Sequence, residues 1–208
     1  MKAAGIEPAP LRSGPTWKQF LTTQAHTILA IDLAHVDTVF LRRLYALIMI
    51  EHESRRVHIA GITAHPTGTW VTQQARNLLE LGDRAAQFRF LIRDRDSKST
   101  DAFDAVFTGA NLNIIQTPAR APRANAFAER WIGTLRRECL DHILTTGPRH
   151  LALVLREYVE HYNTHRPHRS LGQSPPAGPA APPPIDGPRQ PLRRDRLGGI
   201  IHQYLQVA

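Results

Sequence analysis

The sequence has one cysteine, no long apolar run and no excess of acidic residues. Because Cys139 stands alone, an intrachain disulfide and a metal site built from several cysteines are both excluded. No apolar stretch approaches the roughly 20 residues that a membrane-spanning helix needs, and the N-terminal region lacks the charged start and apolar block of a secretion signal. We therefore expect a protein of the cytoplasm without a membrane partner.

Positive charge is present in excess and is concentrated in one segment. The formal net charge is +8. Residues 23–171 hold 19 Lys and Arg against 15 Asp and Glu, and the same excess of four occurs in residues 118–137 alone, where five arginines accompany a single acid, Glu129. Such a segment favours a polyanionic partner, because neutralising phosphates releases condensed counterions. The alternative is a solubilising helix face.

The pattern of apolar residues predicts one α/β layered domain between two tails. We expect an N-terminal linker at 1–22, a core at 23–171 and a Pro-rich C-terminal extension at 172–208, whose end could form one more strand. The expected order in the core is three strands, helix, strand, helix, strand, helix, helix. In the same order the segments are 27–36, 43–50, 55–63, 68–81, 88–92, a short helix containing Phe103 to Phe107, 112–117, 123–142 and a helix that ends before Pro167.

Three acids stand out by their positions in this order. Asp32 interrupts the apolar first strand, Asp94 follows the fourth strand, and Glu129 lies on the long basic helix. An ionised carboxylate in an apolar strand is costly unless something neutralises it, and a pair of divalent cations would neutralise all three. Mg²⁺ held by carboxylates is suited to in-line displacement at phosphorus. For "RDRD", the alternative is a solvated turn in which Arg93 and Arg95 neutralise the two aspartates.

Five motifs resemble the DDE transposases of bacterial insertion sequences and the retroviral-type integrases. They are "AIDLAHVDTV", "RRLYALIMIEHESRRVHIAGIT", "IRDRDSKST", "ANAFAERWIGTLRRE" and "YNTHRPHRSLGQSPP", and the resemblance covers roughly residues 17–176. It implies a ribonuclease H-like mixed sheet of about five strands flanked by helices. The implied activity is metal-dependent DNA strand cleavage and strand transfer by a polynucleotidyl transferase, for DNA integration, recombination or transposition.

The resemblance also implies roles for particular residues. Asp32, Asp94 and Glu129 correspond to the family's catalytic metal ligands and would hold two Mg²⁺ or Mn²⁺ ions, whereas Asp96 would be a turn residue. The partners implied are element-end and target DNA and further copies of the chain, with association to the nucleoid. We expect DNA contacts from Asn125, Arg130, Arg136, Arg137, Lys98, His165, Arg166 and Arg169.

Some features allow other interpretations. Among His161, His165 and His168, the first two are four apart on a helix, which is partial zinc-site spacing. A structural or DNA-facing role is favoured, because Pro167 turns His168 off the helix and no carboxylate or cysteine has a convincing third-ligand spacing. "EHES" at 51–54 is expected to be a polar hairpin, and the three tryptophans to be core anchors. Nothing before Trp17 resembles the helix-turn-helix that reads element ends in the family. The alternative function is therefore a truncated, non-catalytic DNA-binding remnant of a transposase.

Overall fold

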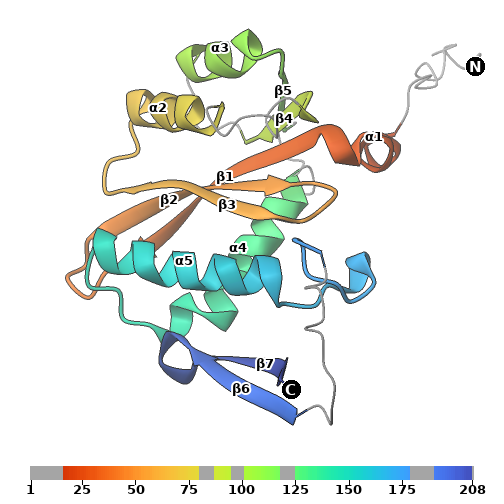
Figure 1. The fold of residues 1–208 in the computed structure, drawn as a ribbon. Helices are drawn as coiled ribbons and strands as arrows, with labels where there is room; N and C mark the ends of the chain where they lie inside the picture. Colours follow the sequence, from red (N-terminus) through yellow and green to blue (C-terminus); the bar gives the residue numbers. More distant parts are fainter. Residues whose placement is uncertain (1–15, 80–86, 95–100, 118–124, 179–189, 208) are drawn as a thin grey trace, which may run out of the picture.

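A computed structural model of the chain describes residues 16–79, 87–94, 101–117, 125–178 and 190–207. In these residues a five-stranded sheet has the order β3-β2-β1-β4-β5 (Figure 1). β1, β2 and β3 pair antiparallel, while β4 and β5 run parallel to β1. The strands are β1 (Ile28–Asp37), β2 (Arg43–Glu51), β3 (Val57–Thr63), β4 (Phe90–Arg93) and β5 (Asn113–Gln116).

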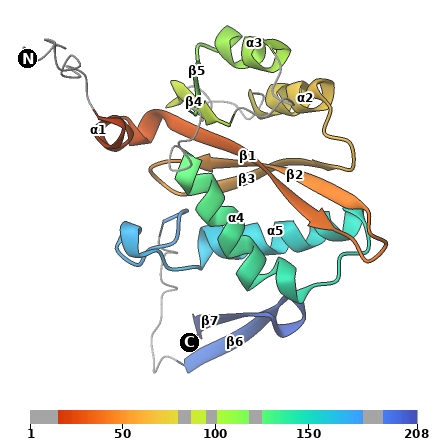
Figure 2. The same ribbon diagram turned by 180° about the vertical axis from the view of Figure 1, so that it is seen from behind.

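Helices cover both faces of this sheet, as Figures 1 and 2 show. They are α2 (Gly68–Leu79) and α3 (Asp101–Gly109) on one face, and α4 (Ala126–Glu138) and α5 (Pro148–Thr164) on the other. Side chains alternate along β1, so Leu29 and Ile31 pack toward α2 and α3, whereas Ala34 and Val36 pack toward α4 and α5. The predicted order of strands and helices in the core is confirmed.

The N-terminal segment is more ordered than the expected linker. Residues Trp17–Thr23 form α1, whose start is stabilised by a capping box between Thr16 and Gln19. Trp17 and Phe20 pack against the strand cluster that contains Ile28, and the Phe20 ring meets Phe90 edge-on at 5.1 Å. α1 therefore extends the core toward β4.

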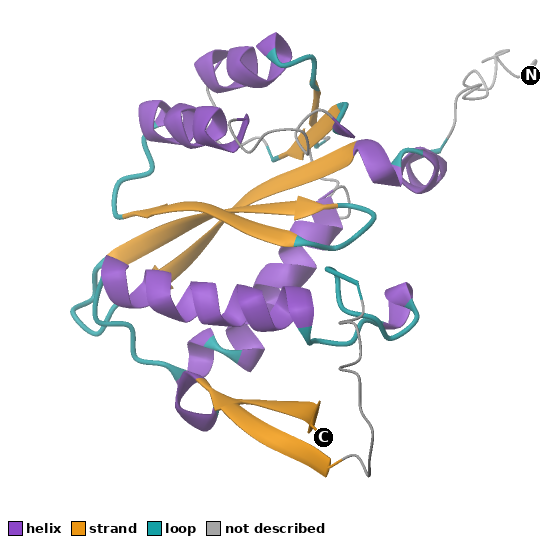
Figure 3. Cartoon of the chain, in the orientation of Figure 1, coloured by secondary structure: helices purple, strands orange, loops and turns teal. Residues whose placement is uncertain are grey.

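The C-terminal segment differs from the expected Pro-rich extension. β6 (Gln190–Arg196) and β7 (Ile201–Val207) form an antiparallel hairpin next to α5 (Figure 3). Ile201 joins the core cluster on the α4–α5 side, and the Arg196 side chain, 8% exposed, binds Glu157 and Glu160 of α5. The single final strand expected from the sequence corresponds to β7, but β6 was not foreseen.

None of the helices in the described ranges has the length and apolar character required to cross a membrane.

Candidate active site

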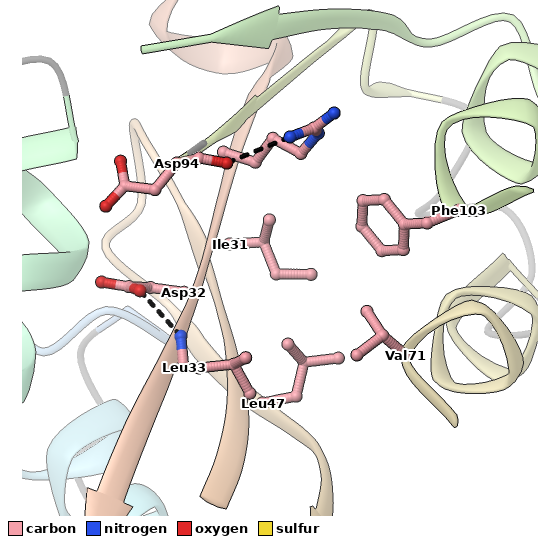
Figure 4. A pocket seen from close by; sticks show the side chains of 8 residues that line it. Ile31, Asp32, Leu33, Leu47, Val71, Asp94 and Phe103 are labelled. Atoms are coloured by element: carbon pink, nitrogen blue, oxygen red, sulfur yellow. Dashed lines mark hydrogen bonds between the residues drawn. The ribbon is translucent and has the colours of Figure 1, made fainter. Parts of the chain in front are cut away.

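Asp32 and Asp94 lie next to each other on adjacent parallel strands. Ile31 of β1 pairs with Arg93 of β4, and each aspartate is the residue that follows this pair. By alternation, Asp32 shares a face with Ala34 and Asp94 shares one with Ile92, so both carboxylates belong to the face covered by α1, α4 and α5. Figure 4 shows the two carboxylates pointing the same way, away from the apolar pocket wall formed by Val71 and Phe103.

Local hydrogen bonds orient the two carboxylates. The backbone N–H of Leu33 donates to Oδ1 of Asp32 at 2.7 Å. The Thr117 hydroxyl, directly after β5, donates to Oδ1 of Asp94 at 3.0 Å. The middle of β1 and the ends of β4 and β5 therefore combine to present two carboxylates at one place.

Arg93 does not neutralise Asp94. Its side chain lies on the opposite face, is 5% exposed and forms a two-pronged ion pair with Asp104 of α3, with distances of 2.9 and 2.6 Å. Its remaining contact with Asp94 is to the backbone carbonyl, at 3.0 Å. The self-paired turn considered for "RDRD" is therefore wrong for Arg93 and Asp94. Arg95, Asp96 and Lys98 lie outside the described residues.

Glu129 lies on α4, on the same face of the sheet as the two aspartates. The start of this helix is tied to β1 because Asn125 donates from Nδ2 to the carbonyl of Ile31, the residue before Asp32, at 3.2 Å. Glu129 follows Asn125 by about one helical turn and is exposed to solvent. α4 thus carries a third carboxylate on the face of the sheet where the two aspartates lie.

The three carboxylates do not form a closed metal cage. Among the residues that the structure describes, no three His, Cys, Asp or Glu side chains are close enough to hold one ion. The donor chemistry nevertheless fits Mg²⁺, because the two adjacent carboxylates are hard oxygen ligands and Mg²⁺ commonly takes one or two of them. Asn125 adds a buried Oδ1 atom that has no hydrogen-bond partner within the described ranges.

α4 carries three arginines and runs beside β1, away from the two aspartates. Arg136 donates to the carbonyl of His35 at 2.7 Å, so α4 follows the strand from Ile31 to His35. Arg130 and Arg137 are exposed, and the Arg137 guanidinium donates to the Thr134 hydroxyl at 3.3 Å. This surface of α4 is basic and open to solvent.

The candidates beyond α5 have different surroundings. Arg166 forms a two-pronged ion pair with Glu138, with Nε 3.0 Å from Oε2, and its guanidinium lies 5.7 Å from the Tyr162 ring centre. Burial lowers the pKa of His165, which is half-buried beside Thr164. Arg169 is exposed. In the described part of the chain, His161, His165 and His168 do not come together as a group that could hold a metal ion.

The β2–β3 turn contains residues whose importance the sequence did not reveal. It is a hairpin as expected, but Glu51 and His52 are each 5% exposed rather than solvated. His52 and Arg55 both pack on Phe127 of α4. No local signal could have identified this contact, because more than 70 residues separate the turn from its partner in the sequence.

Comparisons with known proteins agree with this geometry. Residues 110–176 match the family model of the integrase core domain. The chain is 30% identical over 141 residues, 65% of its length, to the insertion element IS476 uncharacterized 39.2 kDa protein of Xanthomonas euvesicatoria. It spans 39% of the length of that relative.

Two solved structures share the fold. A chain of the simian T-cell lymphotropic virus intasome, in complex with PP2A regulatory subunit B56 gamma, has a TM-score of 0.58 at 12% identity, covering 88% of this chain and 67% of that one. The HTLV-2 integrase catalytic core domain in complex with magnesium, in a trimeric form, has a TM-score of 0.51 at 11% identity, covering 71% and 92%. The ribonuclease H-like fold and the resemblance to an integrase or transposase core are confirmed.

Proposed function

We propose that this chain, with its integrase-type core, is a metal-dependent polynucleotidyl transferase that cleaves DNA strands and joins them. The observation that carries the proposal is the pair of adjacent carboxylates, Asp32 and Asp94, on the face where α4 contributes Glu129. Because Arg93 is bound to Asp104, this arginine does not occupy the Asp94 carboxylate. The roles in transposition and integration belong to this proposal.

The three carboxylates would hold two Mg²⁺ or Mn²⁺ ions, which when bound activate a water or DNA 3′-hydroxyl and stabilise the leaving oxygen. Thr117 and the Leu33 N–H orient the aspartates, so less reorganisation is needed when the DNA binds. The start of α4 fixes the position from which Glu129 reaches the site.

The DNA would lie along α4, because this helix follows β1 from Ile31 to His35 and carries the exposed Arg130 and Arg137. Arg130, Arg136 and Arg137 would contact phosphates, which positions a duplex without reading its sequence. Asn125, Lys98, His165 and Arg169 remain proposed contacts, whereas we leave Arg166 out because Glu138 holds its guanidinium. The same proposal includes assembly of several copies of the chain on DNA. It also includes association with the nucleoid through binding to DNA.

A second candidate is a DNA-binding remnant without catalysis. It is favoured by the absence, among the described residues, of a three-ligand group that includes Glu129. The two candidates differ in one measurable property, which is cleavage of DNA in the presence of Mg²⁺ or Mn²⁺.

The test compares nicking of duplex DNA by the wild type, Asp94→Asn and Asp96→Asn. We expect Asp94→Asn to lower the rate by about 10³-fold, because it removes a carboxylate ligand, and Asp96→Asn to retain most of the activity. If the wild type binds DNA but does not nick it with either metal, the remnant is the correct reading. If Asp96→Asn is the inactive variant, the assignment of Asp94 is wrong by two residues.

A further inference from the structure

An aromatic ring in the first turn of α4 is enclosed by the β2–β3 turn. The Arg55 guanidinium carbon lies 3.5 Å from the ring centre of Phe127. The His52 ring meets the same phenyl ring at 4.1 Å between centroids and an angle of 76°, which is an edge-to-face contact. Two residues of one turn therefore contact a single side chain, that of Phe127, which precedes Glu129 by two positions.

The turn that carries Arg55 is itself held in an unusual conformation. Arg55 has φ of 64°, in the left-handed region that residues other than glycine rarely occupy. Its N–H donates to the carbonyl of Glu51 at 3.0 Å. The buried Glu51 carboxylate accepts from the Ser54 hydroxyl at 2.6 Å, and that hydroxyl in turn accepts from the N–H of Arg56 at 3.1 Å. These bonds direct the Arg55 side chain toward α4.

The surroundings of Arg55 indicate that the ring is its principal partner. Its Nη1 atom is buried and makes no hydrogen bond within the described part of the chain. Burial lowers the pKa of Arg55 to about 10, and the smaller effects of Tyr162, which raises it, and Arg130, which lowers it, oppose each other. A desolvated guanidinium over a phenyl face gains more from the cation–π contact than an exposed one does.

His52 acts in this contact as a neutral ring. Both of its nitrogens are buried without hydrogen-bond partners in the described ranges. Burial, with a smaller contribution from the nearby Arg55 charge, lowers the pKa of His52 to about 4. At neutral pH the imidazole is therefore uncharged, so it packs on Phe127 without placing a second positive charge beside the Arg55 guanidinium.

We propose that Arg55 is a positioning residue, which stacks on Phe127 and thereby fixes the helical turn that presents Glu129. Together with the Asn125 bond to Ile31, this stack attaches the start of α4 at two points, one on β1 and one on the β2–β3 turn. The inference rests on the proposed function, in which Glu129 is the third metal ligand. A ligand displaced by about 1 Å loses much of its contribution, so a rigid turn has a direct chemical consequence.

Hydrogen–deuterium exchange of the full chain tests the positioning without any metal. Arg55→Ala is expected to speed exchange of the amides at 126–131 by roughly tenfold while exchange in α5 stays unchanged. Arg56→Ala, in the same turn and with the same loss of charge, is the matched control and is expected to match the wild type. Arg55→Lys keeps the charge but not the planar stack, so it should recover part of the protection. Unchanged exchange in Arg55→Ala would overturn the inference.

Mn²⁺ titration by calorimetry tests the consequence for the metal ligand. Arg55→Ala should weaken Mn²⁺ binding by roughly 10-fold, as is common for residues that orient a ligand. In a Glu129→Gln background, the same substitution should produce no further loss, because the ligand it positions is already gone. A further loss in that background would show that Arg55 acts elsewhere and would overturn the inference.

The two proposals fail in distinguishable ways. If the wild type binds no Mn²⁺, the proposed function fails, and the metal role of Arg55 fails with it. If the wild type binds Mn²⁺ and Arg55→Ala binds it equally well, only the inference about Arg55 is overturned.

Discussion

The arginines of α4 and those beside α5 carry the same charge in opposite surroundings. On α4, Arg136 contacts a backbone carbonyl and Arg137 a hydroxyl, and both side chains remain accessible. Beside α5, Arg166 is bound to Glu138, and Arg196 is bound to Glu157 and a second glutamate. The first group is available to an external polyanion, whereas the second group holds the fold together. Counting charges in the sequence does not separate the two.

In the second group, we expect removal of Arg196 to cause the largest loss in the free energy of unfolding. The side chain is 8% exposed and pairs with two glutamates that are 34% and 51% exposed. A fully buried pair would cost about 3–5 kcal/mol to break, and partial exposure of the partners reduces our expectation for Arg196→Ala to about 2 kcal/mol. Urea unfolding measures the loss. Arg194→Ala, on the same hairpin but exposed, is the control and should change stability by less than about 0.5 kcal/mol.

DNA binding by one variant from each group of arginines tests the difference between the groups. Arg136→Ala should weaken binding to element-end and scrambled duplexes alike, by about 1 kcal/mol, and lower the log–log salt slope by about 1. Arg166→Ala should leave that slope unchanged, because its charge is already bound by Glu138. A salt titration of both variants decides between the two expectations. A lower slope for Arg166→Ala would return Arg166 to the DNA contacts, and a strong preference for element ends would contradict sequence-independent binding.

The smallest expected effect is a pH dependence of folding stability that arises from His161 of α5. Burial, with a smaller contribution from His165, lowers the pKa of His161 to about 4. Its Nδ1 lies 3.0 Å from Nε2 of Gln203 on β7. Between this value and the ordinary 6.5, the unfolded chain binds a proton that the folded chain does not, so stability falls as the pH falls. From pH 7 to 5 we expect a loss below about 1 kcal/mol, because solvent screens this half-buried group.

Urea titrations at several pH values measure this dependence, with His161→Gln as the comparison. The variant should show a flatter curve over the same range. An equally steep curve would mean that other groups are responsible.

The order of elements in the core could be read from the sequence because it depends on local periodicity. Strands such as β1 and helices such as α4 each need only a repeating apolar pattern, and their bounds differ from the expectation by a few residues. The candidate site residues Asp32 and Asp94 were found for a similar reason, since a lone acid at the end or in the middle of an apolar strand contradicts that pattern. Their assignment as metal ligands stays a proposal.

The β6–β7 hairpin and the contact of His52 and Arg55 with Phe127 could not be predicted from the sequence. β6 contains Pro191 and four charged residues, so its strand character depends on pairing with β7 and on the contact of Arg196 with α5. The position of the Arg55 side chain follows from no apolar pattern in the sequence. Its place depends on a left-handed turn and on a helix that begins more than 70 residues later.

The sequence alone therefore determined the ribonuclease H-like order of elements, the two strand aspartates and the basic character of α4. Only the tertiary structure decided which arginines remain available, because Arg93, Arg166 and Arg196 find their carboxylates 11, 28 and 39 residues away along the chain. The physical reason is that apolar periodicity acts within one element, whereas the neutralisation of a charge depends on which side chain folding brings within about 3 Å of it.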